Sequence, residues 1–255
     1  GRAERERRQR KLGELRTKMR RHPCHACNDR EAHARWAERW WKLTRSTQDL
    51  RRQIASRTGA ISRVFDRLSD VLLELGYLKH GEGDELTVAA PGRMLRRSYG
   101  ERDLLVAECL RTGAWKNLDP AGLAAMAAAL VHEPRRDDEQ HADWSLPRGG
   151  FRSALAKTTA LWSELDDLET AHRLPGSEPP STAISLAMHR WALGSSLDTV
   201  LDEAALAAGD FVRVTKQAID LLDQVSIVAD AEVGVNARAA LDSIRRGIVA
   251  YSSVG

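Results

Sequence analysis

The chain has 255 residues, a length that suits one or two domains, and only 5% of them are aromatic. Its 39 Lys and Arg against 36 Asp and Glu give a formal charge of +3, but the charge is unevenly distributed. Residues 1–52 hold 17 basic and 7 acidic side chains, a net charge of +10, which leaves a net −7 for residues 53–255. The basic segment predicts an anionic partner or an acidic neighbouring domain, and a solvated basic helix is the alternative.

The distribution of apolar residues and cysteines argues against several classes of protein. There is no apolar stretch of signal-peptide length at the start and no run of about 18 apolar residues later, which argues against secretion and membrane spanning. Three cysteines without a framework spacing argue against a disulfide-stapled domain. We therefore expect a cytoplasmic protein with no membrane partner. Because the sequence opens directly on charged helix formers, we also expect it to be part of a longer protein.

The N-terminal part predicts a basic helical stalk over residues 1–45. Residues 2–21 are nearly all helix formers, and their apolar positions form one narrow stripe on a charged rod. The stripe consists of Leu12, Leu15 and Met19. A turn then leads into a second helix over 31–43, in which Trp36, Trp40 and Leu43 share a face. Such a rod is typical of a stalk or of half an antiparallel helical hairpin, because it would not be stable alone.

Residues 46–98 predict a winged-helix module. One helical stretch covers 46–54, and another, over 61–75, repeats apolar side chains every three or four positions. The composition then changes to two short strands at 77–80 and 85–88, joined by the turn GEGD. Two helices followed by a small β-hairpin are the order of a winged helix.

Residues 99–255 predict an all-α bundle of about five or six helices. One helix start fits the positions N′, N-cap, N1 and N4 of a capped helix with a hydrophobic staple. These positions are held by Leu118, Asp119, Pro120 and Leu123. Two polar segments rich in Pro and Gly, at 133–150 and 174–181, predict surface loops. The expected fold class is mostly α: a basic stalk, a winged-helix module with a β-hairpin, and a C-terminal helical bundle.

Nucleotide chemistry is not predicted for this chain. It has neither the Gly-x-x-x-x-Gly-Lys-Ser/Thr loop nor a Gly-rich turn between strand and helix that would cradle a phosphate. Residues 138–141 spell a DExH box, but such a box needs a buried parallel strand and a phosphate loop beside it, so we interpret it as a coincidence in a polar loop. We expect no catalytic residue here and no ATP turnover by the chain alone.

His22, Cys24, His25, Cys27 and His33 form the densest set of potential metal ligands. Thiolates with this spacing can share a zinc ion, but a closed site needs four ligands and would have to recruit His33 or His22. The alternative is a turn between helices with reduced, partly packed cysteines. We therefore expect no metal and no other cofactor in this chain, and keep Cys24 and Cys27 as the metal candidate to test.

Cationic side chains on helices are the candidate nucleic-acid contacts. They are Arg63, Arg67, Arg213, Lys216, Arg245 and Arg246. Arg63 and Arg67, four apart, share a face of the helix that would be the recognition helix. Arg213 and Lys216 share a face of a later helix that Asp210 is expected to cap, and the last two arginines are expected to project from the final helix. Arg and Lys neutralise phosphates without reading sequence, which suits a translocating enzyme; the alternative for each is a solvated helix face.

Several separated motifs resemble one family. The strings AGDFVRVTKQAIDLLDQV at 208–225 and ARAALDSIRRGIVAYSSV at 237–254 resemble the C-terminal signature of the Ski-like DEAD/DEAH-box RNA helicases, the DSHCT domain. Upstream, HPCHAC, HARWAERWWKL, FDRLSDVLLELGYL and LLVAECLRTGAW resemble the actinobacterial HelY branch of that family. These motifs occur in the expected order and cover nearly the whole chain.

The resemblance implies a parent protein that couples ATP hydrolysis to 3′ to 5′ translocation on single-stranded RNA or DNA. ATP and Mg would be held by two RecA-like domains that this sequence does not contain, and that RecA-like helicase core would be its protein partner. Residues 1–45 would belong to the returning stalk of an inserted arch, and 46–98 would complete a winged helix that braces the core. Residues 99–255 would form a helical bundle whose ratchet-like helix touches the departing strand.

The resemblance also ranks the candidate contacts. The run from Gly209 to Arg213 matches the family's opening of the ratchet-like helix, which makes Arg213 the foremost nucleic-acid contact. Val214 and Thr215 depart from the aromatic and small residues expected there, so base stacking by this helix is not assigned. The winged helix of this family mostly contacts protein. The resemblance therefore implies that Arg63 and Arg67 dock on the helicase core, with contact to nucleic acid as the alternative.

Two other kinds of protein stay open. A free-standing winged-helix regulator would need Arg63 and Arg67 to face solvent, a dimer, and sequence-specific duplex binding. A scaffold whose basic rod docks a protein would have no measurable nucleic-acid affinity.

Overall fold

The structure is a computed structural model that describes residues 2–83, 85–95, 102–133, 146–204 and 206–251. It divides into two compact units, unit 1 over residues 1–63 and unit 2 over residues 64–255. The DExH string at 138–141 and most of the predicted loop at 133–150 lie outside the described residues. The predicted domain boundaries after residues 45 and 98 stay predictions.

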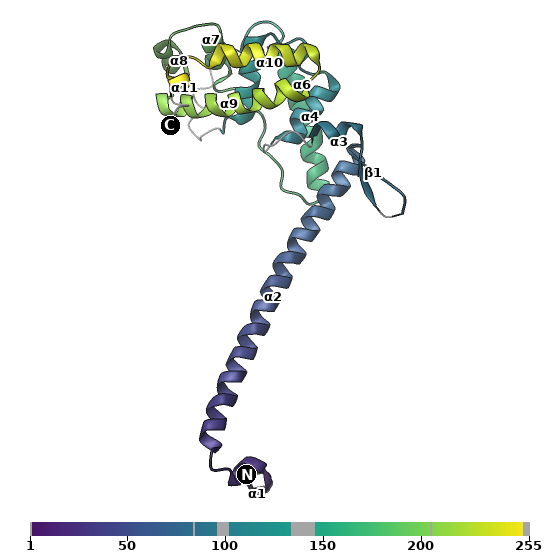
Figure 1. Ribbon diagram of the computed structural model, residues 1–255, viewed down its shortest axis with the longest axis vertical. Coiled ribbons are helices and arrows are strands. Elements are labelled where there is room, and N and C mark those ends of the chain that lie inside the picture. The colour runs from purple at the N-terminus through teal and green to yellow at the C-terminus, as the bar shows by residue number, and fades with distance from the viewer. Residues whose placement is uncertain (1, 84, 96–101, 134–145, 205, 252–255) are drawn as a thin grey trace. The chain divides into compact units, whose positions relative to one another are not determined.

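Unit 1 consists of helices and a short turn (Figure 1). α1 spans Arg2–Arg21, the 3-10 helix η1 spans Pro23–Ala26, and α2 spans Arg30–Glu74 and so continues into unit 2. Helices are thereby confirmed over 2–21 and 31–43. The predicted breaks between 31–43, 46–54 and 61–75 were wrong, because α2 is continuous. Gly59, the weakest helix former at the expected break, costs a helix only about 1 kcal/mol relative to Ala.

Unit 2 begins with the end of α2 and the predicted hairpin. Gly76, with φ of 77°, takes the left-handed conformation that ends the helix. β1, Leu78–His80, then pairs antiparallel with β2, Leu86–Val88. The hairpin is confirmed, and a short helix, α3 over Ala90–Leu95, follows it.

The described remainder of unit 2 contains eight helices, more than the five or six predicted. They are α4 (Asp103–Thr112), α5 (Pro120–Val131), α6 (Phe151–Ala171), α7 (Ser185–Ala192), α8 (Leu197–Ala204), α9 (Ala208–Val228), α10 (Ala231–Ile244) and α11 (Gly247–Tyr251). The shortest of them make only one or two turns, too few for the 3.6-residue repeat to be recognised in a sequence. None of the described helices combines the length and apolar character that crossing a membrane needs.

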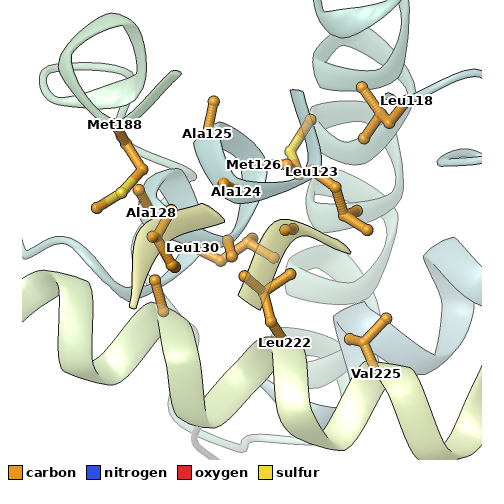
Figure 2. Close-up of a cluster of buried hydrophobic side chains, with 14 of the residues drawn as sticks. Leu118, Leu123, Ala124, Ala125, Met126, Ala128, Leu130, Met188, Leu222 and Val225 are labelled. Atoms are coloured by element: carbon orange, nitrogen blue, oxygen red, sulfur yellow. The ribbon is translucent and has the colours of Figure 1, made fainter. Parts of the chain in front are cut away.

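α5 lies at the centre of the bundle. Its residues 121–130 are all buried, as expected of a helix that is apolar all round. Figure 2 shows Leu123, Met126 and Leu130 among side chains of the neighbouring helices, with Met188 from α7 and Leu222 from α9. The small alanines of α5 let these helices approach closely, so the core forms around it.

The predicted capped start of α5 is confirmed. The Asp119 carboxylate accepts a hydrogen bond from the backbone N of Gly122 at 2.7 Å, and Pro120 occupies the first turn. Leu118 and Leu123, the staple pair, are both buried. α10 is attached at the same place, because the side chain of Asn236 donates to the carbonyl of Leu118 at 3.0 Å.

Candidate nucleic-acid interface

α9 turns one side to the core and leaves the other open. Phe211, Val214, Ala218, Leu222 and Val225 are at most 1% exposed, so they fix the rotation of the helix against α5 and α10. The open side carries the exposed side chains of Arg213, Gln217, Asp220 and Ile227. These positions follow the three-and-four spacing of a single helix face.

Arg213 lies on this open face, near the N-terminus of α9. Its guanidinium donates only a long hydrogen bond, 3.5 Å, to the side-chain oxygen of Gln217. Lys216 is half-buried beside it. The N-terminal end of a helix also carries the positive end of the backbone dipole, so this end of α9 favours an anionic group.

The start of α9 differs from the prediction. The N-cap is Ala207, which offers no side-chain acceptor, and Asp210 lies inside the first turn rather than at the cap. The predicted cap at Asp210 was therefore wrong. The spacing of the apolar side chains located the helix, but the buried Phe211 ties α9 to the core strongly enough that a polar cap is not needed.

Val214 and Thr215, the two positions that depart from the family pattern, both face the core. They are 1% and 0% exposed, and the Thr215 hydroxyl donates to the carbonyl of Phe211 at 2.7 Å. Neither side chain can reach a strand outside the bundle. Their departure from the pattern therefore concerns packing, and Arg213 stays exposed on the open face.

Arg246 has a different environment from Arg213. The two arginines expected on the last helix lie instead in the link between α10 and α11, because α10 ends at Ile244. The Arg246 guanidinium donates 2.6 Å hydrogen bonds to the carbonyls of Trp191 and Ser195 and stacks on the Trp191 ring, 3.5 Å from its centre. Burial lowers the pKa of Arg246 from its ordinary value, which still leaves it charged.

The Trp191 ring connects this link to α9. Its indole N–H donates to the carbonyl of Ile244 at 3.0 Å, and its edge meets the Phe211 ring at a centroid distance of 5.6 Å. Arg246 therefore holds the end of α7 and, through Trp191, the first turn of α9. Sequence reasoning did not find this role, because nothing in the spacing pairs residue 191 with residue 246.

Arg245 remains available on the surface. It is exposed, and within the part of the chain that the structure describes its backbone N–H donates to the carbonyl of Leu241 at 3.0 Å. Arg245 thus has an exposed side chain, whereas the side chain of its neighbour Arg246 makes structural contacts.

The two arginines of α2 also differ. Arg63 is exposed at the end of unit 1, whereas the Arg67 guanidinium in unit 2 donates to the carbonyl of Arg173 at 3.1 Å. Arg173 itself has a φ of 57°, a left-handed conformation that is unusual outside glycine. Arg67 therefore secures the turn after α6.

The potential metal ligands in the turn of unit 1 lie only partly close to one another. The Cys27 thiol lies 3.6 Å from Nδ1 of His33, and Nδ1 of His22 accepts from the backbone N of Cys24 at 3.2 Å. Throughout the described residues, no three His, Cys, Asp or Glu side chains lie close enough together to hold a metal ion. Cys24 and Cys27 stay a metal candidate without a formed site.

A polar cluster at the base of the hairpin, buried at Tyr77 and Glu108, was not predicted. The Tyr77 hydroxyl donates to the Glu108 carboxylate at 2.6 Å, and Arg111 pairs with the same carboxylate. Glu108 is only 3% exposed. The burial of Tyr77, together with the negative charge of Glu108, raises the pKa of the Tyr77 hydroxyl well above its usual value. The cluster joins the hairpin to α4 and so fixes the base of the helical bundle.

The comparison with known proteins assigns the family. Residues 85–252 match the DSHCT (NUC185) domain, and this match covers more than half of the chain. The chain belongs to the DSHCT domain family. The resemblance to its C-terminal signature is thereby confirmed.

The relatives are mycobacterial proteins named as probable helicases. Over 252 residues the chain is 39% identical to the protein named "Probable helicase HelY" of Mycobacterium tuberculosis (strain ATCC 25618 / H37Rv) and 37% identical to the one of Mycobacterium leprae (strain TN). These matches cover 95% of this chain but only 28% and 27% of the relatives. The chain is thus of the actinobacterial HelY type, and it spans little more than a quarter of the length of the relatives it matches.

Proposed function

We propose that this chain is the C-terminal accessory region of an ATP-dependent helicase that moves 3′ to 5′ along RNA or DNA. In the parent protein, ATP and Mg would be held by a RecA-like core that lies outside this sequence. Residues 46–98 would brace that core, and the open face of α9 would guide the single strand. The observation that carries the proposal is the exposed Arg213 on a helix whose other side is locked into the core of a DSHCT domain.

The chemistry of the α9 face suits a moving strand. A cation at the end of a flexible stem neutralises a phosphate without recognising a base, so it can release one nucleotide and accept the next. Arg213 provides that cation, Lys216 lies one turn further along the helix, and Arg245 offers a second exposed cation on the α10–α11 link. Arg246 would act indirectly, by holding Trp191 against Phe211 at the start of α9.

The bracing role is proposed for residues 46–98 and for the exposed Arg63, which would pair with acidic groups of the core. The rigid base that such a brace needs is supplied by the buried pair of Tyr77 and Glu108, with Arg111 bound to the same carboxylate from the surface. The free-standing regulator is less well supported, because Arg67 is engaged with the carbonyl of Arg173 rather than presented to solvent.

The proposal is tested by fluorescence-anisotropy binding of the chain to 3′-tailed single strands of RNA and of DNA over a salt series. Binding should weaken linearly on a log–log plot, and Arg213→Ala should reduce the slope by about 0.7 if the arginine neutralises one phosphate of a single strand. Gln217→Ala, on the same face without a charge, is the matched control and should leave the slope unchanged. An equal slope for wild type and Arg213→Ala would refute the role of α9, and measurable ATP turnover by this chain would refute the assignment as an accessory region.

A further inference from the structure

The turn between α1 and α2 holds two cysteines on the same side. Among residues 22–33, Cys24, Cys27 and Ala32 are half-buried and the other residues are exposed. The two cysteines lie three positions apart across η1, where the backbone N–H of Cys27 donates to the carbonyl of Cys24 at 3.4 Å. Side chains three positions apart in a 3-10 turn are eclipsed. Both thiols therefore lie on the sheltered, inner side of the turn.

His33 brings an imidazole to this side from the first turn of α2. Its backbone N–H donates to the carbonyl of Asp29 at 2.9 Å, and its Nδ1 lies 3.6 Å from Sγ of Cys27. Zinc binds sulfur at about 2.3 Å and nitrogen at about 2.0–2.1 Å, so a tetrahedral ion holds these two atoms about 3.6 Å apart. The pair of Cys27 and His33 therefore has the separation that two ligands of one zinc ion require.

We propose that Cys24, Cys27 and His33 bind one zinc ion, which closes the turn between α1 and α2. Zinc is the divalent ion that both thiolate and imidazole ligands suit. This proposal replaces the expectation, drawn from the sequence, of a chain without a metal. It goes beyond the proposed helicase function and does not depend on it.

Binding of the ion exchanges protons and moves one side chain. Two Zn–S bonds and one Zn–N bond form, and the two thiol protons pass to solvent, so nothing is oxidised or reduced. No three potential ligands already lie close enough to hold an ion in the described part of the chain. The Cys24 thiol therefore turns toward Cys27 and His33 as the ion binds. Water completes the tetrahedral set, as in other zinc sites with three protein ligands.

The ion would supply a rigidity that unit 1 does not obtain from packing. None of the described side chains of unit 1 is buried, so no apolar core sets the shape of the turn. Small structures without such a core commonly depend on a bound metal. Zinc would tie η1, which follows α1 directly, to the first turn of α2. It would thereby limit the relative motion of the two helices.

Another histidine of the turn provides a matched control. His25 follows Cys24 by one position, a third of a 3-10 turn, so it lies on a different side from the thiols. It is exposed, as His33 is. His22 is less suitable as a control, because its Nδ1 accepts a hydrogen bond from the backbone N of Cys24 at 3.2 Å. His25→Gln thus removes an imidazole from the same turn without removing a ligand.

The test titrates the full 255-residue chain, kept reduced, with Co²⁺ as a coloured substitute and then with Zn²⁺. One equivalent of cobalt should give the absorption of thiolate-bound, tetrahedral cobalt, and zinc should displace it. Native mass spectrometry should show the chain with one zinc added and two protons lost. Cys24→Ser, Cys27→Ser and His33→Gln should each weaken zinc binding by about 100-fold or more, since losing even a residue that only orients a ligand costs about 10–100-fold. His25→Gln should bind zinc as wild type does.

Thiol reactivity gives a second readout. Without added metal, Cys24 and Cys27 should react with a thiol reagent, and one equivalent of zinc should slow both reactions by about tenfold or more. The buried Cys109 is the internal control and should stay unmodified with or without zinc. Circular dichroism checks that each variant keeps its helix content.

Three results would overturn the proposal. The first is a chain that shows no thiolate-bound cobalt, and the second is zinc binding that Cys24→Ser leaves unchanged. The third is a loss of affinity in His25→Gln as large as that in His33→Gln, because binding would then not depend on the side of the turn.

Discussion

Replacing Arg246 by Ala should destabilise unit 2, although it removes no side chain from the open face of α9. The substitution removes the hydrogen bonds to the carbonyls of Trp191 and Ser195 and the stacking on the Trp191 ring. A hydrogen bond from a charged group is typically worth about 1.5–3 kcal/mol, and a cation–π contact about 0.5–2 kcal/mol. Because Arg246 is only half-buried, solvent screening reduces these values, and we expect a loss of about 2–3 kcal/mol.

That loss corresponds to a fall in Tm of about 4–12 °C for a unit of this size. Thermal unfolding followed by far-ultraviolet circular dichroism measures it. Arg245→Ala is the matched control, since the neighbouring side chain is exposed, and it should change stability by no more than about 0.5 kcal/mol. Equal stability of the two variants would refute the structural role of Arg246.

Three further predictions concern the core of unit 2. Asp119→Ala removes the cap of α5 and should cost about 1 kcal/mol in denaturant unfolding. Gly92→Ala places a Cβ 2.4 Å from the carbonyl oxygen of Tyr77 and should cost about 1–3 kcal/mol by the same measurement. Burial raises the pKa of the Cys109 thiol from 9.0 to about 12, so a thiol reagent should modify it only after unfolding. Because the unfolded chain then loses this proton more readily than the folded one, stability should fall as the pH rises from about 9 toward 12.

The glycine and cysteine predictions each have a control in the same chain. Gly13, inside α1, has nothing within 4 Å of an added Cβ, so Gly13→Ala should raise helix content rather than lower stability. Cys24 and Cys27 are half-buried in the turn of unit 1 and should react in the folded protein, which leaves one thiol unmodified until denaturant is added. Three reactive thiols in the native state, or an Asp119→Ala variant as stable as wild type, would contradict the described packing.

The sequence predicted those parts of the fold that local signals determine. The cap at Asp119, the strands around the turn GEGD and the apolar repeat of α9 depend on neighbouring residues, and the structure has all three. The continuity of α2 was missed because a glycine weighs little against a long helix. The helices α3, α8 and α11 were missed because they make too few turns to show a period.

The candidate site was predictable only in part. The spacing of Arg213 and Lys216 predicted that they share a helix face, and in the structure Arg213 is exposed and Lys216 is half-buried. Spacing could not distinguish Arg245 from Arg246, because the second is engaged by carbonyls of a segment more than fifty positions earlier. The hydrogen bond between Tyr77 and Glu108 could not be predicted from the sequence either, because it depends on tertiary packing rather than on a local pattern.

Photo-crosslinking of a thiouridine-substituted single strand to the chain, with the attached peptides mapped by mass spectrometry, tests the central claim most directly. The account predicts cross-links in the peptide that carries residues 209–217, at the open end of α9, and their loss in Arg213→Ala. Cross-links confined to other parts of the chain, or cross-links at 209–217 that persist in Arg213→Ala, would contradict the claim that α9 guides the strand.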